Sequence, residues 1–342
     1  MNPKAHQPDS LPAPGPTALA QSEALAGQIR AEIAQAGGWL PFDRYMERAL
    51  YAPGLGYYGG GSVKFGRRPE DGSDFVTAPE LSPLFAATLA RPVAQALEAE
   101  APALAARVRW LDALPQQFEG VVIGNEVLDA MPVRLFAHAG GVWHERGVTL
   151  HEGVFEFEDR PVNSAQDVEF LAEIEVDGEY VTETHDAARA FTRTICTMLT
   201  RGAALLIDYG FPRHEYYHAQ RAGGTLMCHY RHRAHGDPFV YPGLQDITAH
   251  VEFTGIAEAG VEAGADLLGY TSQARFLLNA GITEVLGEID PTDTARFLPA
   301  ANSVQKLLSE AEMGELFKVI AFSRGIEETL DAFASGDRTH TL

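Results

Sequence analysis

Polar side chains follow three apolar segments that have the length and composition of short buried strands. The segments and the polar residues behind them are 108–111 with Asp112, 121–123 with Asn125 and Glu126, and 203–207 with Asp208. Strands that are apolar on both faces are typical of a parallel sheet covered by helices, and such sheets bind ligands at the carboxyl ends of their strands. We therefore expect these side chains at one functional edge, where carboxylates can hold a cation and accept its proton.

Two further residues could take part in that chemistry. Asp129 lies three residues after Glu126, and His250 lies within the segment DITAHVEF. Imidazole has a pKa near neutrality, so His250 is a candidate proton acceptor or orienter of a carboxylate. The structural alternatives are that Asp129 caps a turn, that Glu126 merely ends a strand, and that His250 is a hydrogen-bonded structural group.

A segment rich in glycine, tyrosine and proline runs from residue 54 to residue 83. Irregular segments of this length in compact domains are usually functional loops. Its side chains could cover a ligand or shape an entrance, although its tyrosines could instead pack as an apolar lid. The candidates are Tyr57, Tyr58, Asp74, Thr77, Pro79, Glu80 and Ser82.

The formal net charge of the 342 residues is −21, which argues against a nucleic-acid phosphate backbone as partner and suits a basic substrate. Two cysteines are too few for a disulfide framework, and no apolar stretch has the length that a bilayer-spanning helix needs. Residues 1–16 have the composition of a disordered tail and resemble neither a secretion signal nor a transit peptide. We expect a cytoplasmic protein without membrane insertion.

The periodicity along the chain predicts an α/β fold. Apolar residues at helical spacing predict helices at 17–36, 42–50, 84–101 and 260–286, and the run 318–322 predicts a last strand. Alternating short segments between 133 and 181 predict antiparallel hairpins, inserted into the sheet domain.

Several segments, in this order, resemble one known family. They are FDRYMERALYAPGLGYY, SDFVTAPELSPLF, GNEVLDAMPVRLF, IDYGF, DITAHVEFT, GYTSQARFLL and EMGELFKVIAFSRG. Together they cover most of the chain and resemble the MidA-like S-adenosyl-L-methionine (SAM)-dependent methyltransferases, relatives of the mitochondrial arginine methyltransferase of complex I assembly. The resemblance implies a Rossmann-like class I methyltransferase sheet and SAM as cofactor. It also implies a protein substrate with an accessible arginine, such as a subunit of respiratory complex I, and is compatible with a homodimer.

The resemblance also implies roles and boundaries. Together with the residue types, it leads us to expect acceptor and proton chemistry at Glu126, Asp129, His250 and Asp208, and substrate contacts at Tyr57, Tyr58, Asp74, Ser82 and Tyr209. Cofactor contacts fall to Asp112, Ala113, Asn125, Glu126, Thr77, Pro79 and Glu80. The expected organisation is a tail at 1–16, helices and a loop at 17–83, the methyltransferase domain at 84–132 and 182–330, the β insertion at 133–181, and a tail at 331–342.

The chain departs from the family at the place where the fold normally contacts SAM. Members carry a strand, a glycine-rich turn, a helix and a second strand ending in an acid, but here no glycine lies between residues 84 and 117. Such a unit needs about 30 residues or more, and it is missing near residues 99–107. The alternatives are a natural deletion and an incomplete record.

Other functions are less well supported by the residues. A catalytically inactive binding or assembly factor would keep the substrate surface without the cofactor half. A hydrolase built on Asp208 and His250 lacks a GxSxG motif. Cys228, His229, His232 and His235 do not have the spacing of a structural zinc site, so we expect no metal.

Overall fold

The computed structural model describes residues 11–61, 64, 73–97, 111–176, 178–326 and 330–342. The chain divides into two compact units. The first unit comprises residues up to Val76 together with Leu128–Ala188 and His214–His250, and the second comprises Thr77–Val127, Arg189–Arg213 and Val251–Leu342. This grouping places residues 214–250, which the sequence assigned to the methyltransferase domain, in the first unit.

Two helices near the N-terminus form where the sequence predicts them. Helix α1 (Pro16–Gln35) begins with a proline in its first turn and buries Leu25, Ile29 and Ile33 on one face. Gly37 and Gly38 follow it with φ angles of 80° and 91°, a left-handed conformation that ends the helix. After the short strand β1 (Trp39–Pro41), helix α2 (Phe42–Tyr51) buries five of its residues against the same core.

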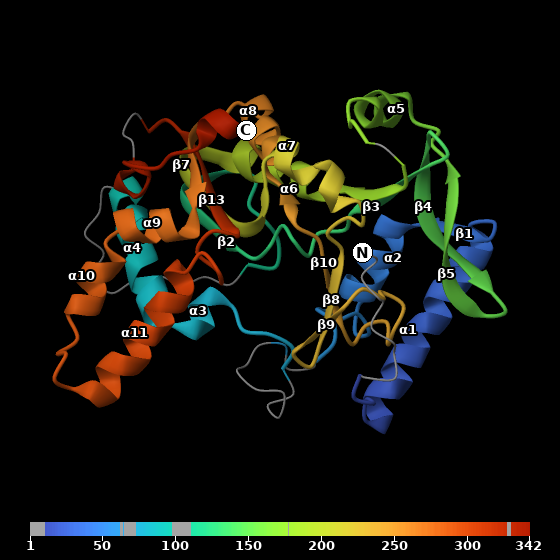
Figure 1. Cartoon of the computed structure of the whole chain (residues 1–342), viewed down its shortest axis with the longest axis horizontal. Coiled ribbons are helices and arrows are strands. Elements are labelled where there is room, and N and C mark those ends of the chain that lie inside the picture. The colour runs from blue at the N-terminus through green and yellow to red at the C-terminus, as the bar shows by residue number, and fades with distance from the viewer. Residues whose placement is uncertain (1–10, 62–63, 65–72, 98–110, 177, 327–329) are drawn as a thin grey trace. The chain divides into compact units, whose positions relative to one another are not determined.

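The first unit also contains β3 (Arg134–Ala139), β4 (Val142–His151), β5 (Val154–Pro161), α5 (Ala165–Ala172) and β6 (Tyr180–Thr184). Its strands form an antiparallel sheet of the order β1-β4-β3-β6, in which β5 also pairs with β4 (Figure 1). These strands are the hairpins that the alternating pattern between 133 and 181 predicts.

A smaller sheet of three strands lies in the same unit. It has the order β10-β8-β9 and consists of β8 (Met227–Tyr230), β9 (Arg233–His235) and β10 (Asp246–Thr248). Arg231 and His232 form the turn between β8 and β9 with φ angles of 48° and 58°. A two-residue hairpin turn commonly requires positive φ at both central positions, so these two side chains occupy positions that usually favour glycine or asparagine.

The sheet of the second unit mixes parallel and antiparallel pairs. It consists of β2 (Phe118–Asn125), β7 (Leu199–Phe211), β11 (Val251–Glu252), β12 (Asp266–Ser272) and β13 (Phe317–Arg324). Strands β2 and β11 pair with β7 in parallel, β13 pairs with β7 antiparallel, and β12 pairs with β13 antiparallel. The predicted strands 121–123, 203–207 and 318–322 are therefore present.

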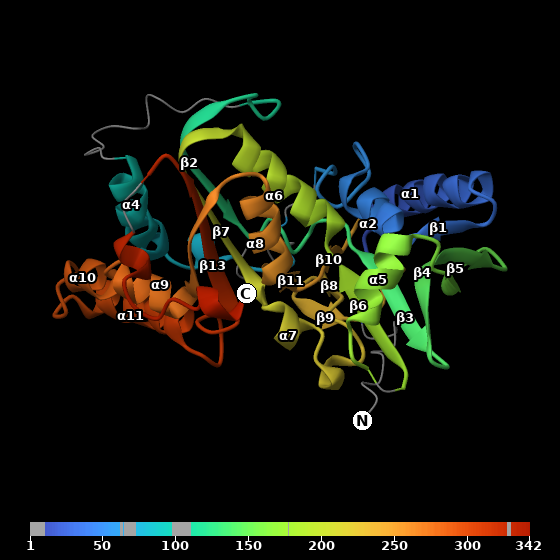
Figure 2. The same ribbon diagram turned by 90° about the horizontal axis from the view of Figure 1, so that it is seen from above.

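Helices cover both faces of this sheet (Figures 1 and 2). One face carries α4 (Pro83–Leu97), α9 (Gln273–Asn279), α10 (Ile282–Gly287) and α11 (Thr294–Leu308), whose apolar residues share a core with Leu205, Ile207 and Val319. The other face carries α8 (Phe253–Glu262), where a Cβ atom on Gly260 would clash with the ring of Phe322. The remaining helices are α3 (Ala78–Leu81), α6 (Asp186–Met198) and α7 (Arg213–Tyr216).

Two sequence predictions need correction. The expected helix at 260–286 is interrupted, because residues 266–272 form β12 and pair along β13 instead. The expected strand at 108–111 does not include Leu111, which is exposed and outside any strand, while residues 108–110 lie outside the described part of the chain. The predicted site of the missing segment, near 99–107, also lies outside it, and within the described residues β2 pairs with β7 alone.

Candidate functional site

The carboxyl end of β2 places Asn125 and Glu126 beside β7. Asn125 lies in register with Ile207, and the next residue, Glu126, adopts a φ of 52°. The Glu126 N–H donates to the carbonyl oxygen of Ile207 at 2.8 Å, and the Asn125 amide donates to the Glu126 carboxylate at 3.0 Å. Glutamate rarely adopts this left-handed conformation, and residues that do so cluster at functional sites.

Asp208 lies in β7 and is fully buried. One of its carboxylate oxygens accepts a hydrogen bond from the Val127 N–H at 3.1 Å, and the other accepts from the Tyr209 N–H at 3.0 Å. Both oxygens therefore bind backbone donors, one of which directly follows Glu126. We call Asn125, Glu126 and Asp208 the strand-end group.

A second group of ionisable side chains lies within the first unit. Asp246, at the start of β10, accepts a hydrogen bond from the Tyr58 hydroxyl at 3.0 Å, and Asp74 accepts one from the Tyr57 hydroxyl at 2.8 Å. The side chains of Asp246, Asp74 and Asp129 are each at most 5% exposed. The Asp246 cluster comprises Tyr51, Tyr57, Tyr58, Lys64, Asp74, Asp129 and Asp246.

Burial dominates the electrostatics of this cluster. Burial and, to a smaller extent, the negative charge of Asp129 raise the pKa of Asp246 to about 8, while the Tyr58 hydrogen bond acts in the opposite direction. Burial also raises the pKa of Asp74 and lowers the pKa of Lys64, whose ammonium lies 4.6 Å above the ring of Tyr57. Asp246 is thus protonated near neutral pH.

Asp246 was not predicted as a site residue from the sequence, although it lies in the segment DITAHVEF that was noted for His250. An acid directly before an apolar strand is usually a local turn residue. The available signal was that this acid begins the same short segment as His250.

His250 is held through its backbone by the first unit. Its N–H donates to the Thr225 hydroxyl at 3.0 Å, and its carbonyl oxygen lies 2.7 Å from the Nε2 atom of His185. The hydroxyls of Thr225 and Tyr216 both donate to Glu183, which is fully buried and has a raised pKa because of that burial.

The structure brings several of the predicted site residues together. The Ala249 N–H donates to the Asp129 carbonyl at 2.9 Å, so the segments of Asp129 and His250 are in direct contact. Within the first unit the grouped residues are Tyr57, Tyr58, Asp74, Asp129 and His250, and within the second they are Asn125, Glu126 and Asp208.

The other predicted residues of the second unit lie in more local settings. Thr77 precedes α3, and Pro79 and Glu80 are exposed within it. Ser82 is buried and accepts from the Leu84 N–H, and the Tyr209 ring packs edge-on against Phe317. Asp112 and Ala113 are exposed in the loop before β2 rather than at the end of a strand.

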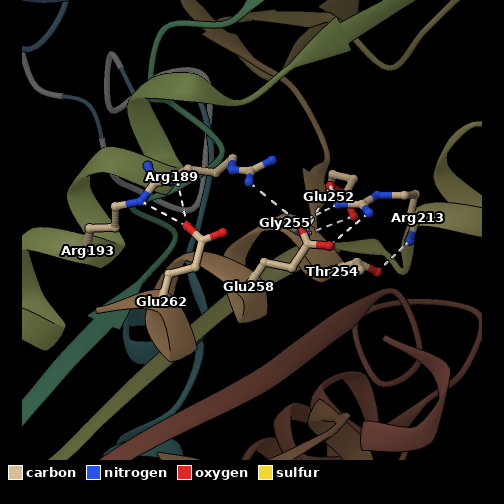
Figure 3. Close-up of polar contacts among 8 residues, drawn as sticks. All are labelled: Arg189, Arg193, Arg213, Glu252, Thr254, Gly255, Glu258 and Glu262. Carbon is tan, nitrogen blue, oxygen red and sulfur yellow. Dashed lines mark hydrogen bonds and ion pairs between the residues drawn. The ribbon is translucent and has the colours of Figure 1, made fainter. Parts of the chain in front are cut away.

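A network of charged residues in the second unit joins α6, β11, α8 and Arg213, the first residue of α7 (Figure 3). Glu252 is 4% exposed, accepts twice from the Gly255 N–H, and lies 3.6 Å from Arg213. Arg213 also binds both oxygens of Glu258, and Arg193 pairs with Glu262 at 3.1 Å. Three arginines and three glutamates, with Arg189 as the third arginine, balance one another here.

Metal sites and membrane-spanning helices are both absent from the described residues. No group of three or more His, Cys, Asp or Glu side chains is arranged to hold a metal ion within that part of the chain. Of the helices described, none has the length and hydropathy needed to cross a membrane.

Comparison with curated proteins finds arginine methyltransferases. The chain is 31% identical to "Protein arginine methyltransferase NDUFAF7 homolog, mitochondrial" of Caenorhabditis elegans, over 50% of this chain and 39% of that protein. It is 24% identical to the Drosophila melanogaster homologue, over 95% of this chain and 90% of that protein. The chain thus spans about two fifths of the nematode relative. The fly alignment runs over 414 residues, so the fly protein carries internal residues that have no counterpart in these 342.

Two crystal structures of COG1565 superfamily proteins from Burkholderia thailandensis share the fold. One, bound to S-adenosyl-homocysteine, is 66% identical, with a TM-score of 0.95 over 97% of this chain and 100% of that chain. The other, a native structure, is 64% identical with a TM-score of 0.90 over the same shares. The family described as "Putative S-adenosyl-L-methionine-dependent methyltransferase" matches residues 80–271, more than half of the sequence. The chain belongs to this family of SAM-dependent methyltransferases.

Proposed function

We propose that this methyltransferase transfers the methyl group of SAM to an arginine side chain of a protein, with a subunit of the respiratory complex I type as the substrate. The observation that carries the proposal is Glu126, a carboxylate in a left-handed conformation at the carboxyl end of a parallel strand. A guanidinium is cationic, and a carboxylate at this position can orient it and stabilise its charge.

The residues at this strand end fit the cofactor. The Oδ1 atom of Asn125 is buried and has no hydrogen-bond partner among the described residues. Buried polar atoms are nearly always hydrogen-bonded, so this acceptor suits a donor that the cofactor brings, such as an amino or hydroxyl group. Asn125 and Glu126 would hold SAM at this edge, and SAM supplies an electrophilic methyl group on its sulfonium.

The protein needs no nucleophile of its own for this reaction. Glu126 would orient the guanidinium so that a nitrogen faces the methyl group, and positioning of this kind contributes about 7 to 11 kcal/mol. The arginine nitrogen loses a proton during or after the transfer, and Asp129 and His250 are the groups that we assign to accept it. The Tyr57, Tyr58 and Asp74 side chains would contact the substrate.

The sheet of the second unit supports a Rossmann-like class I arrangement. Parallel strands β2 and β7 lie next to β13, which runs antiparallel between β7 and β12. The strands that would extend such a sheet beyond β2 correspond to the segment predicted to be missing.

We also propose that the protein acts in the cytoplasm. Its proposed protein partner, apart from the substrate, is a second copy of the same chain in a homodimer.

The first experiment is titration calorimetry of SAM and S-adenosyl-homocysteine into the purified 342-residue chain, with intact mass confirming its length. We expect micromolar binding, because a structure 66% identical holds S-adenosyl-homocysteine. If the folded chain binds neither compound, the alternative of a catalytically inactive binding or assembly factor is favoured.

The second experiment tests the substrate. Respiratory complex I is purified from cells that lack this gene, incubated with the chain and methyl-labelled SAM, and hydrolysed to amino acids. Label in methylarginine supports the proposal, and label in lysine or other residues contradicts it. Glu126→Gln should lower the rate about 100-fold by removing the charge that holds the guanidinium. Glu152→Gln is the matched control, because Glu152 also has positive φ but lies in the β4–β5 turn.

A further inference from the structure

Glu126 holds a backbone conformation that its own side chain disfavours. For residues other than glycine the left-handed region costs roughly 1 to 2 kcal/mol. Such a residue persists only where the surrounding contacts determine the conformation more strongly than the residue does. The contacts that do so at Glu126 are therefore part of the site.

The backbone is fixed on both sides of this residue. The Glu126 N–H donates to the carbonyl oxygen of Ile207 at 2.8 Å, which continues the β2–β7 ladder by one bond. The following N–H, of Val127, donates to the side chain of Asp208 at 3.1 Å. Asp208 thus supplies the acceptor for this N–H at the point where the chain leaves the strand.

An aspartate is well suited to this place. It is 0% exposed, and its second oxygen accepts from the Tyr209 N–H at 3.0 Å, which anchors the carboxylate in β7. Hydrogen bonds from backbone N–H groups to a carboxylate are charge-assisted, and they offset the cost of burying it. An asparagine here could present only one oxygen to two donors.

We propose that Asp208 is a positioning residue for methyl transfer, which acts through Glu126 by holding its left-handed conformation and thereby aiming its carboxylate. This inference rests on the proposed function, in which Glu126 holds the acceptor cation. In this role Asp208 acts through the backbone N–H groups that its two oxygens bind.

A double-mutant cycle on activity tests this dependence. Asp208→Asn should lower kcat tenfold or more in the parent chain. In the Glu126→Gln background the same change should have less than a twofold effect, because residues that act through one another are not additive. Equal effects in both backgrounds would overturn the proposal. Glu252→Gln is the matched control, since Glu252 is also buried and accepts backbone N–H bonds, and its effect should be additive.

A melting experiment tests the same inference without any activity. In the parent chain, losing Asp208 lets Glu126 leave the strained conformation, and this relief offsets part of the lost bonding. Glycine adopts positive φ freely, so a Glu126→Gly chain has no strain to release. Asp208→Asn should therefore lower the melting temperature less in the parent than in the Glu126→Gly background, whereas equal decreases would contradict the inference. If the parent chain transfers no methyl group, the proposed function fails while this arm still decides the role of Asp208.

Discussion

Two groups of charged residues, each with at least one buried carboxyl group, differ in how their charges are compensated. In the second unit, the network around Glu252 contains three arginines and three glutamates, and its buried carboxylate also accepts backbone N–H bonds (Figure 3). In the first unit, the Asp246 cluster gathers three carboxyl groups and three tyrosines, with the ammonium of Lys64 beside them. The first arrangement lowers the cost of burial, whereas the second leaves one carboxyl protonated near neutral pH.

This difference indicates a structural role for the Glu252 network and a functional role for the Asp246 cluster. In a network whose charges balance, mutating the exposed members should have small effects on stability. Groups whose pKa values are strongly shifted by burial and by like charges tend to lie at functional sites. The Asp246 cluster contains three of the residues that the sequence assigned to substrate contacts, namely Tyr57, Tyr58 and Asp74.

The largest expected effect concerns the pH dependence of stability. Asp246 has a folded-state pKa of about 8 against an ordinary value of 3.8, so between these values the folded state keeps a proton that the unfolded state releases. Stability therefore falls as pH rises from about 4 to about 8, by at most about 1.4 kcal/mol per pH unit from this group. Urea unfolding at pH 5, 6, 7 and 8 should show a shallower slope for Asp246→Asn than for the parent. Identical slopes would mean that Asp246 is ionised in the fold.

The sequence predicted the elements whose signal is local. Helix α1 was predictable because Leu25, Ile29 and Ile33 share one face and glycines end it. Strand β12 was not, because Tyr270 and Thr271 are held in a strand by pairing along β13, which is a contact between distant segments. Local pattern cannot report such pairing.

The candidate site was predictable by residue type but not by role. The strand-end residues were identified because polar residues that follow predicted parallel strands meet at one edge of a sheet. The engagement of Asp208 with the Val127 and Tyr209 N–H groups depends on backbone geometry that has no sequence signature. Asp246 was missed because its raised pKa arises first from burial and then from the charge of Asp129, which lies 117 positions away in the chain, and neither is visible in the local sequence.

A second prediction concerns the buried member of the balanced network. Arg213→Ala removes the cation nearest to Glu252, whose pKa is already raised by burial, and also removes the two hydrogen bonds of Arg213 to Glu258. Because hydrogen bonds to charged groups contribute about 1.5 to 3 kcal/mol, we expect a loss of about 2 kcal/mol in the free energy of unfolding. Arg213→Lys should recover part of it. A loss of unfolding free energy smaller than that expected for an exposed ion pair would show that the hydrogen bonds from the Gly255 N–H alone compensate the buried charge of Glu252.

A third prediction distinguishes positioning from stability in the first unit. Thr225→Val removes the acceptor of the His250 N–H and should cost about 1 kcal/mol, with a severalfold fall in methyl transfer. Thr149→Val is the matched control, because its hydroxyl also bonds a backbone group, Gly38, at 2.8 Å. It should destabilise similarly and leave the rate unchanged. Equal losses of rate in both variants would assign Thr225 to stability alone, and Thr225→Ser should restore the parent behaviour.

The smallest effect is expected at the exposed end of the same network. Arg193 and Glu262 pair at 3.1 Å, but their side chains are 43% and 57% exposed, so solvent screens the attraction. Arg193→Ala should change the free energy of unfolding by about 0.5 kcal/mol or less, and the change should vanish at high salt. Measuring Arg193→Ala, Glu262→Ala and the double variant by urea unfolding isolates the pair. A coupling free energy between Arg193 and Glu262 as large as the loss expected for Arg213→Ala would mean that the network acts as one unit. Its buried end, at Glu252, and its exposed end, at Glu262, would then not differ in their contribution to stability.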